Sequence, residues 1–281
     1  MNKGCDSELP ASCQTHSMQT VPFLGLEPGR DGLHWRLPVV PRLTTGGDFL
    51  FGGAGLGAGV AALEGSTGRP LVWATAQYLS FARPGQVVDY DVTIASEGRA
   101  SSQARVVATV DGTEILTVNG ALGRRDWEGA PQWAERPAVP LPDACPPQEH
   151  RQNHEGRIHA TIETRLAMGR QRSTMDGTPG DGRSALWARV PGLDVSSALL
   201  GLLGDYVPFG VGQALGQHAG GRSLDNTIRV ARLVPTEWVL LDIRVHAVAN
   251  GYGHGLVHLW SDDGTLLGTA SQTCAVRHHR D

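Results

Sequence analysis

The chain has 281 residues and a mass of 29.9 kDa, which corresponds to about two domains at roughly 150 residues each. Hydrophobic residues make up 40% and charged residues 19%, a composition that excludes general disorder. A formal net charge of −4 excludes the basic surplus that drives binding to nucleic acids or anionic membranes. Four scattered cysteines do not suggest a disulfide framework, which favours a reducing, cytoplasmic location.

The N-terminal residues 1–20 are polar and lack the apolar core of a signal peptide, so we expect a disordered tail there. No run of about 18 apolar residues occurs in the chain, which predicts no membrane span. A first unit follows over residues 21–123 and ends at a stretch rich in proline and charge. That stretch, residues 124–156, has no periodicity and is interpreted as a linker to a second unit over residues 157–281.

The first unit contains a glycine-rich segment, FGGAGLGAGVAAL at residues 51–63, that is apolar on nearly every face. Such a pattern predicts a buried helix. Glycine is about 1 kcal/mol worse than alanine in a helix, so the glycine density indicates close contact with a sheet or a ligand. The run from Gly53 to Ala58 also fits the dinucleotide fingerprint GxGxxA. The preceding RLTTGGD is not an apolar strand, and residues 72–79 contain no acid, so we reject that function.

The strands after this helix recur in the second unit. Residues 88–94 and 241–247 alternate between apolar and more polar side chains at a separation of 151 residues, and alternation of period two predicts strands. Ala82-Arg83 recurs as Ala231-Arg232 after 149 residues, and the DGT turn at 111–113 recurs at 263–265 after 152. One supersecondary unit is therefore used twice, each copy with a helix, four strands and a DGT hairpin between the last two.

The second unit has a long loop at 169–183 and a second helix-like apolar segment from Ser196 to about Leu215. A buried helix wrapped by an antiparallel sheet belongs to the α+β class. We therefore expect two antiparallel sheets, each wrapping one buried helix and packed side by side.

Several ordered blocks resemble the acyl-CoA thioesterase II family. FGGAGLGAGVAALE, YLSFARPG and VDYDVTIASEGRASSQARVVATVDGTEIL resemble its first half, and SLDNTIRVARLVPTEWVLLDI with DDGTLLGTASQTCAVR resembles its second half. The resemblance covers roughly residues 45–277. It implies a double hotdog fold, in agreement with the repeat, and a homo-oligomer, because members of this family extend their sheet edges by pairing with other chains.

The resemblance also implies a catalytic set, in which an Asp, a Ser or Thr, and a Gln together hold a water molecule. The matching positions are Asp205 in the second helix, Ser223 before a Leu-Asp pair, and Gln272 in the last strand. The glycine-rich helix start, at Gly52 and Gly53, would offer backbone N–H groups to the substrate. In the first unit, Ser223 maps onto Ala74 at a separation of 149, and Gln272 maps onto Gly120 at 152. That unit is therefore expected to line the substrate without carrying catalytic groups.

The chemistry is consistent with these residue types. A thioester is an activated acyl group, so a carboxylate that accepts a proton from an oriented water molecule is sufficient for its hydrolysis. Apolar neighbours of Asp205 would raise its pKa. For Asp205 the alternative stays open that it merely caps or interrupts a helix near Pro208. For Asp225 two roles stay equally open: it orients the site, or it forms a salt bridge to an arginine such as Arg229.

Other kinds of site are not favoured by the sequence. His254 and His258 lie four apart in a strand pattern, about 13 Å from each other and too far for one ion, and His278-His279 is a terminal pair, so we expect no metal. No GxSxG elbow occurs, and Cys274 has no evident activating partner. The resemblance therefore predicts an acyl-CoA thioesterase that needs no cofactor. The alternative is a non-catalytic protein that binds acyl thioesters on the same fold. A hotdog hydratase is disfavoured because neither helix contains a histidine.

Overall fold

The computed structural model describes residues 20–150 and 154–278, so the tail predicted for residues 1–20 lies almost wholly outside the described residues. The helices are η1 (Pro41–Leu43), α2 (Gly52–Thr67), η2 (Pro142–Ala144), α3 (Ile158–Thr161), η3 (Arg172–Thr174), α4 (Ser197–Leu203) and α5 (Val207–Leu215). The strands of the N-terminal half are β1 (Glu27–Pro28), β2 (His34–Pro38), β3 (Leu71–Tyr78), β4 (Val87–Glu97), β5 (Ser101–Val110) and β6 (Thr113–Gly123). Those of the C-terminal half are β7 (Glu163–Met168), β8 (Arg183–Arg189), β9 (Ala219–Ser223), β10 (Asp225–Val230), β11 (Val239–Ala249), β12 (Tyr252–Ser261) and β13 (Leu266–His278).

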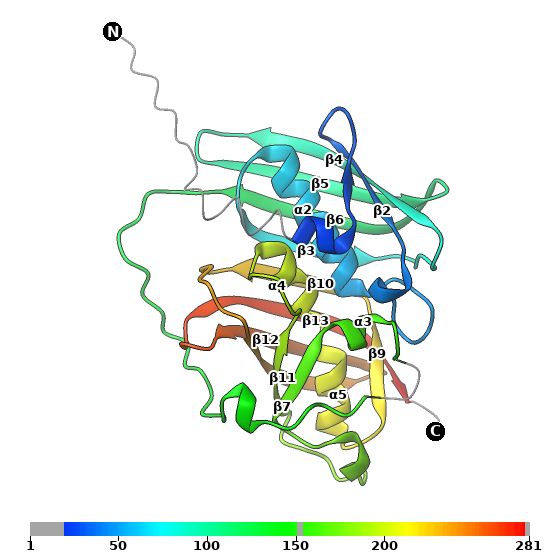
Figure 1. Cartoon of the computed structure of the whole chain (residues 1–281), viewed down its shortest axis with the longest axis vertical. Helices are drawn as coiled ribbons and strands as arrows, with labels where there is room; N and C mark the ends of the chain where they lie inside the picture. Colours follow the sequence, from blue (N-terminus) through cyan, green and yellow to red (C-terminus); the bar gives the residue numbers. More distant parts are fainter. Residues whose placement is uncertain (1–19, 151–153, 279–281) are drawn as a thin grey trace.

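All of these strands belong to one antiparallel sheet, in the order β1-β2-β4-β5-β6-β3-β10-β13-β12-β11-β8-β7, with β9 paired to β13 (Figure 1). The expectation of two separate sheets side by side is therefore corrected: the two halves are continuous through the antiparallel pair β3–β10. The physical reason is that β3 and β10 each end one half, and pairing them satisfies backbone groups that two separate sheets would leave open.

The pair β3–β10 has approximate two-fold symmetry. Thr75 lies opposite Thr227, 152 residues later, and their hydroxyl groups form a hydrogen bond of 2.9 Å. The neighbouring strand pairs β3–β6 and β10–β13 show the same separation of 152 residues. Thr75 pairs with Asn119 in the first, and Thr227 pairs with Ser271 in the second. At this separation the counterpart of Ala74 is Asn226, so the mapping of Ser223 onto Ala74 at 149 residues was wrong.

Helix α2 is buried between the sheet of the N-terminal half and α4, and it packs against both without room for side chains at most of its glycines. A Cβ atom on Gly57 would lie 2.8 Å from the carbonyl oxygen of Ala198, and one on Gly59 would lie 2.8 Å from Val118 Cγ2. The expectation that the glycine density reflects close contact with a sheet is confirmed.

The second apolar segment is two helices, not the single helix expected over residues 196–215. Ser196 caps α4 by accepting a hydrogen bond from the N–H of Leu199 at 3.1 Å. Pro208 stands in the first turn of α5, where a missing N–H is tolerated, and so the chain breaks at Gly204 to Tyr206. Among the described residues, Ser197–Leu215 is the segment long and apolar enough to cross a membrane, with a mean hydropathy of 1.2, but 78% of it is buried inside the molecule.

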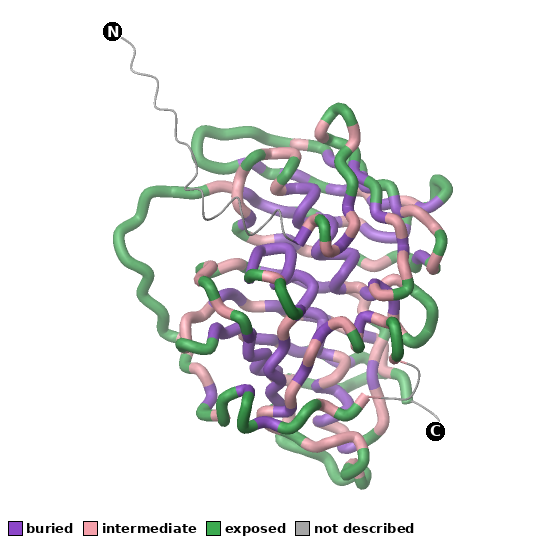
Figure 2. Tube along the Cα trace, viewed as in Figure 1, coloured by how far each residue is buried: buried purple, intermediate pink, exposed green. Residues whose placement is uncertain are grey.

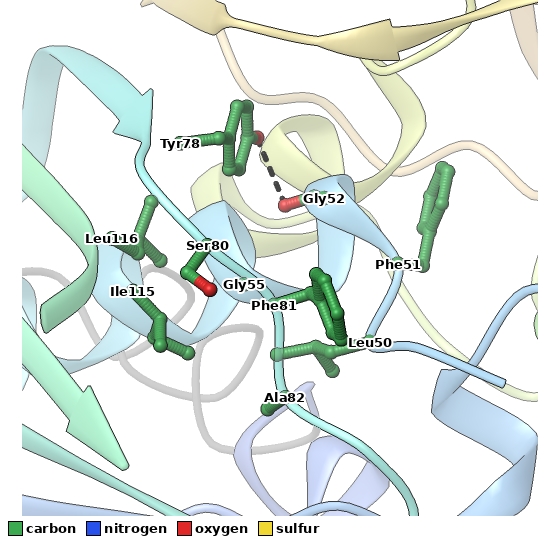
Figure 3. A pocket seen from close by; sticks show the side chains of 10 residues that line it. All are labelled: Leu50, Phe51, Gly52, Gly55, Tyr78, Ser80, Phe81, Ala82, Ile115 and Leu116. Atoms are coloured by element: carbon green, nitrogen blue, oxygen red, sulfur yellow. Dashed lines mark hydrogen bonds between the residues drawn. The ribbon is translucent and has the colours of Figure 1, made fainter. Parts of the chain in front are cut away.

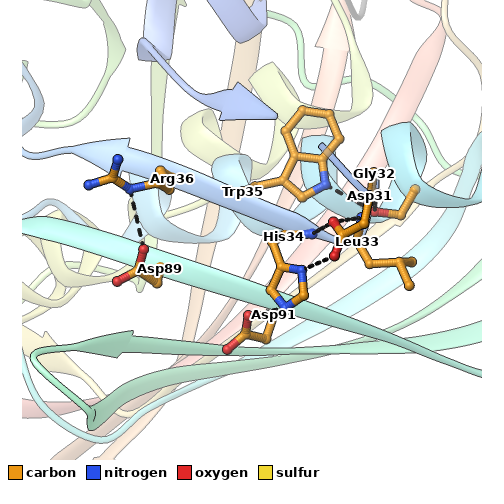
Figure 4. Close-up of polar contacts among 9 residues, drawn as sticks. Asp31, Gly32, Leu33, His34, Trp35, Arg36, Asp89 and Asp91 are labelled. Atoms are coloured by element: carbon orange, nitrogen blue, oxygen red, sulfur yellow. Dashed lines mark hydrogen bonds and ion pairs between the residues drawn. The ribbon is translucent and has the colours of Figure 1, made fainter. Parts of the chain in front are cut away.

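Two strands precede the helix in each half, and the sequence reading did not foresee them. Strand β2 pairs with β4, and ion pairs join His34 to Asp91 at 3.1 Å and Arg36 to Asp89 at 3.5 Å (Figure 4). Trp35 points the other way and donates a hydrogen bond to Ser66 at 3.0 Å. In the C-terminal half five strands rather than four follow the helices, because the strand expected there is divided into β9 and β10.

Buried residues run continuously through the centre of the molecule, across both halves (Figure 2). A second, smaller cluster contains Trp187, Trp238, Trp260 and Cys145. Trp187 donates its indole N–H to the carbonyl oxygen of Pro140 at 2.9 Å. Part of the segment predicted as a linker therefore packs on the strands of the C-terminal half.

Candidate active site

The break between α4 and α5 places the Asp205 carboxylate against the N-terminus of α2, where side chains from both halves meet. The backbone N–H of Gly53 donates to Asp205 Oδ2 at 2.7 Å. The Ser223 hydroxyl, at the end of β9, donates to Asp205 Oδ1 at 3.1 Å. Gln272 on β13 donates its Nε2 to the same oxygen and also to Ser223 Oγ, the latter at 2.7 Å. The structure thus brings together the three residues expected to be catalytic and, at the start of α2, both glycines expected to bind substrate.

Gly52 lies beside the same carboxylate. A Cβ atom at this position would be 2.7 Å from Asp205 Oδ2 and 3.2 Å from Tyr78 Cζ, so a side chain would displace one of them. The Gly52 carbonyl oxygen accepts a hydrogen bond from the Tyr78 hydroxyl at 2.9 Å, whereas its N–H has no hydrogen-bond partner among the described residues. Because Phe51 supplies no side-chain cap to α2 and Asp205 takes the N–H of Gly53, the N–H of Gly52 is the group of this turn that we consider available to a ligand.

The electrostatics of the site follow from burial. Asp205 is only 6% exposed, and burial raises its pKa to about 6, against the lowering effect of the hydrogen bonds from Gln272, Ser223 and Gly53. Burial likewise raises the pKa values of Tyr78 and Tyr206, and the nearby Asp205 charge adds to both shifts. At neutral pH the carboxylate is therefore mostly ionised, yet basic enough to accept a proton.

Several buried polar groups of this region have no partner in hydrogen-bonding geometry within the described chain. They are Gln272 Oε1, the Tyr206 hydroxyl and both amide atoms of Asn226. Asn226 stands one residue before the pair Thr227–Ser271, so strand alternation puts its side chain on the same face as that of Gln272. Unpaired buried groups of this kind are places where water or polar substrate atoms bind.

Sequence reasoning missed Tyr78, Tyr206 and Asn226. Asn226 is a fully buried amide on β10, two residues before the apolar Ile228, and only the structure shows this burial. Three imidazoles that were also missed, those of His150, His154 and His159, pack against one another with ring centroids 5.1–5.9 Å apart. The ring centroids of His159 and Tyr206 lie 6.5 Å apart. Burial lowers the pKa of His159 to about 3, so this imidazole is neutral.

The other candidate residues have structural roles. Asp225 accepts a hydrogen bond from the N–H of Thr273 at 2.8 Å and so fixes β10 to β13. Burial raises the pKa of Cys274 to about 11, which keeps its thiol protonated. His254 lies within hydrogen-bonding distance of Thr273, at 3.2 Å, and His258 stacks on Trp260. Over residues 20–150 and 154–278 no group of three His, Cys, Asp or Glu side chains is placed to hold a metal ion, and His279 lies outside these ranges.

Comparison with known families gives two adjacent matches. The sequence profile of the acyl-CoA thioesterase N-terminal domain matches residues 40–123, and that of the acyl-CoA thioesterase C-terminal domain matches residues 142–276. None of the curated protein sequences is significantly similar to the chain.

Solved structures resemble most of the chain. A proposed thioesterase from Novosphingobium aromaticivorans is 33% identical, with a TM-score of 0.79 over 89% of this chain and 97% of that one. A hot dog protein of unknown function from Alicyclobacillus acidocaldarius is 19% identical, with a TM-score of 0.79 over 91% and 96%. An acyl-CoA thioesterase II from Mycobacterium marinum is 20% identical, with a TM-score of 0.71 over 92% and 98%.

Proposed function

The chain belongs to the acyl-CoA thioesterase family, and from this premise we propose that it hydrolyses acyl-CoA thioesters to a free acid and CoA by direct attack of a water molecule. The family supports thioester hydrolysis in general. The observation that carries the specific mechanism is the Asp205 carboxylate, which is buried, hydrogen-bonded by Ser223, Gln272 and Gly53, and has a pKa of about 6.

Asp205 is proposed to act as the general base. One O–H bond of the water breaks, its proton passes to the carboxylate, and the water oxygen forms a bond to the thioester carbon. Ser223 and Gln272 are proposed to fix the direction of the carboxylate and the water, because they bond to each other as well as to Asp205. Such positioning removes part of the entropic barrier to attack.

The negative charge that develops on the carbonyl oxygen needs a donor. The unpaired N–H of Gly52 at the N-terminus of α2 is proposed for this role, because the helix dipole favours negative charge at that end. Collapse of the tetrahedral species breaks the C–S bond, and the protonated Asp205 returns its proton to the CoA thiolate. Gly53 differs from Gly52, since its N–H holds the Asp205 carboxylate.

The test is Asp205→Asn, which keeps the shape of the side chain and removes the proton acceptor. We expect single-turnover hydrolysis of acyl-CoA, followed by free-thiol detection, to fall by roughly 10²–10⁴-fold. Affinity for acyl-CoA, measured by calorimetry on the same preparation, should change little.

The matched control is Asp225→Asn, since an asparagine oxygen can still accept the hydrogen bond from the Thr273 N–H. This variant should keep its activity. Undiminished hydrolysis in Asp205→Asn would remove Asp205 from the mechanism. Tight binding without turnover in the unmodified protein would instead favour the non-catalytic binding protein.

A further inference from the structure

Asn226 is a buried amide beside the candidate catalytic residues, and the mechanism above gives it no role. It is 0% exposed, and neither its Nδ2 nor its Oδ1 has a hydrogen-bond partner among the residues that the structure describes. Burying an amide without partners costs free energy, because its polar atoms lose water and gain nothing in return. Such a group therefore needs an explanation, and a bound water molecule or a polar substrate atom supplies one.

The internal repeat shows that the fold does not require this amide. In the N-terminal half Ala74 pairs directly with Gly120, and both are buried. Their counterparts 152 residues later are Asn226 and Gln272. The same place in the sheet is thus built from two small residues in one half and from two amides in the half that carries Asp205. The amides are therefore associated with the site and not with the architecture.

Gln272 has an unpaired acceptor on the same face of the sheet. Asn226 and Gln272 lie on the adjacent strands β10 and β13, with their side chains on one side. Gln272 Nε2 donates to Asp205 Oδ1 and to Ser223 Oγ. These two bonds fix the orientation of the amide, because a flipped amide would place its oxygen against the carboxylate. Gln272 Oε1 is then left without a partner in the described part of the chain.

The Asp205 carboxylate also has an acceptor position left. Its Oδ1 accepts hydrogen bonds from Ser223 and Gln272, whereas the one donor to Oδ2 within the described chain is the N–H of Gly53. Because each carboxylate oxygen accepts about two hydrogen bonds, Oδ2 can take one more. No hydrogen bond between described residues joins Asn226 to Asp205, and a water molecule is small enough to bridge them.

Asn226 adjoins Tyr78 of the N-terminal half on its other side. It pairs with Ala76 of β3, and Tyr78, two residues further along that strand, faces the same side of the sheet. The Tyr78 hydroxyl donates to the Gly52 carbonyl oxygen at 2.9 Å, and both residues line a small pocket that is large enough for a water molecule (Figure 3). Water therefore has room beside Tyr78, next to the buried amide.

We propose that Asn226 is a positioning residue that holds the attacking water molecule together with Gln272 and Asp205. The water donates one hydrogen to Asp205 Oδ2 and the other to Gln272 Oε1, and it accepts a hydrogen bond from Asn226 Nδ2. Its remaining lone pair attacks the thioester carbon. The O–H bond that points to Asp205 breaks as the C–O bond forms, and the second O–H bond stays intact. The proposal rests on the proposed thioesterase function and adds a residue to it.

The first experiment removes the polar groups of Asn226 in two ways. Asn226→Leu keeps the branched shape of the side chain, and Asn226→Ala introduces the residue type that the N-terminal half has at Ala74. Both should lower kcat for acyl-CoA hydrolysis by roughly 10–1000-fold, because the water loses its orientation. Affinity for a non-hydrolysable acyl-CoA thioether, measured by calorimetry, should change little.

Two results of this experiment would contradict the proposal. A loss of kcat in Asn226→Leu alone would be a steric effect of the larger side chain. Weaker binding of acyl-CoA with an undiminished kcat would place the amide on the substrate and not on the water.

Thermal unfolding separates a positioning role from a structural one. If Asn226 stabilised the fold, its replacement would lower the unfolding temperature and the activity together. An amide kept for the reaction has the opposite signature, because leucine buries no polar group. Asn226→Leu should therefore unfold at the temperature of the unmodified protein or up to about 4 °C higher, while its kcat falls. A lower unfolding temperature together with the lower kcat would assign Asn226 a structural role. Should Asn226→Leu not fold, Asn226→Ala and Asn226→Asp still test the proposal.

Asn226→Asp changes the pH profile if residue 226 faces the carboxylate. The variant keeps an acceptor for the water, and it places a second carboxylate near Asp205, where two like charges raise the pKa of one of them. The midpoint of kcat/KM against pH should move upward by about one unit or more, and the plateau should stay within about tenfold of the unmodified protein. Tyr78 and Tyr206, whose pKa values burial raises, stay neutral from pH 5 to 9.

An unmoved midpoint in Asn226→Asp would show that residue 226 does not face the carboxylate, against the proposal. A plateau far below that of Asn226→Ala would mean that the amide donates to the substrate carbonyl oxygen, which also overturns the role in holding water.

Thr227→Val is the matched control. Thr227 is the next residue of β10, it is also buried, and its hydroxyl bonds to Thr75 on the opposite face of the sheet. This variant should keep the kcat, the KM and the pH midpoint of the unmodified protein. Unchanged hydrolysis in Asn226→Leu and Asn226→Ala would overturn the role of Asn226 and leave the thioesterase function standing. Absence of hydrolysis in the unmodified protein would overturn the proposed function, and this proposal with it.

Discussion

Two opposing influences act on the pKa of the Asp205 carboxylate. Burial raises its pKa, and hydrogen bonds from Gln272, Ser223 and Gly53 lower it, with a balance at about 6 against an ordinary value of 3.8. A shift of two pKa units corresponds to roughly 3 kcal/mol. Because the folded chain binds this proton more tightly than the unfolded chain, the contribution of Asp205 to stability is present below pH 4 and is lost as the pH rises through 6. The site is thus less stable in the ionised form that can act as a base.

The pH dependence of hydrolysis follows from the same value. Only the ionised carboxylate accepts a proton, so kcat/KM should rise with pH through a midpoint near 6 and level off above it. The measurement is kcat/KM with a short acyl-CoA from pH 4.5 to 8 at constant ionic strength. A flat profile over this interval would show that no group with this pKa limits the reaction of the free enzyme.

Gln272 should act on the rate and on the pKa together. Its Nε2 donates to both Asp205 and Ser223, and its hydrogen bond is the largest influence that lowers the Asp205 pKa. Gln272→Ala should therefore lower kcat by roughly 10–1000-fold and move the midpoint of the pH profile upward. Ser271→Ala, on the opposite face of β13, is the control and should change neither. A loss of rate with an unmoved midpoint would mean that Gln272 does not act through the carboxylate.

At the residue scale, the resemblance to the thioesterase family was sufficient to select Asp205, Ser223 and Gln272, which lie together in the structure. Their catalytic role stays a proposal. The resemblance could not select Tyr78 or Asn226. Their side chains reach the site only because β3 pairs with β10 in one register, and no local pattern specifies the register between strands 150 residues apart.

At the interface between α2 and α4, close packing requires glycine at one position and leaves room for a side chain at another. A Cβ atom on Gly57 would lie 2.8 Å from the backbone oxygen of Ala198, which cannot move aside, whereas a Cβ atom on Gly201 would meet its nearest atoms at 3.5 Å. Gly57→Ala should therefore lower the free energy of unfolding by about 1–3 kcal/mol. Gly201→Ala should leave it unchanged or raise it by up to about 1 kcal/mol, because alanine is the better helix former.

Urea denaturation of the two variants at one pH checks this difference. Gly57 and Gly201 face each other across one interface and are both buried. A difference in stability between the two variants is therefore not caused by a difference in solvent exposure of the two positions. Equal losses of stability in both variants would contradict the packing argument.

At the element scale, the sequence was most informative where a segment was apolar throughout or where a turn motif recurred. The buried helix α2 and the DGT hairpins were predicted from local pattern, and the structure contains them. The break between α4 and α5 was not predicted, since Pro208 is compatible with either the interior break or a later end of one helix. The strands β1, β2, β7 and β8 were also missed. β1 has two residues and β2 has five, and β8 is buried at successive positions, so that it does not alternate.

At the scale of the whole molecule, the repeat predicted two units but not how they join. The alternation of apolar and polar residues in β3 and β10 is the same whether the strand lies at an open edge or is paired. Only the structure therefore shows that the sheet is continuous. The outer edges of that sheet are short or covered: β1 has two residues and ends in Pro28, and β7 is bridged by Pro147 opposite Arg165. The expected homo-oligomer stays a prediction, and these edges offer little backbone for extending the sheet.

The continuous sheet implies that the two halves unfold together. They share the pair β3–β10, the packing of α2 on α4, and the hydrogen bond between Gly53 and Asp205. Val106→Ala removes two methyl groups from a fully buried residue of β5, in the N-terminal half, and should cost roughly 2 kcal/mol. Hydrogen exchange under mildly denaturing conditions should then show the same loss of protection in β12 of the C-terminal half as in β5. The reciprocal change, Val257→Ala in β12, should weaken β5 equally. If each variant loses protection only in its own half, the two halves unfold independently, and the contacts between them add no cooperativity.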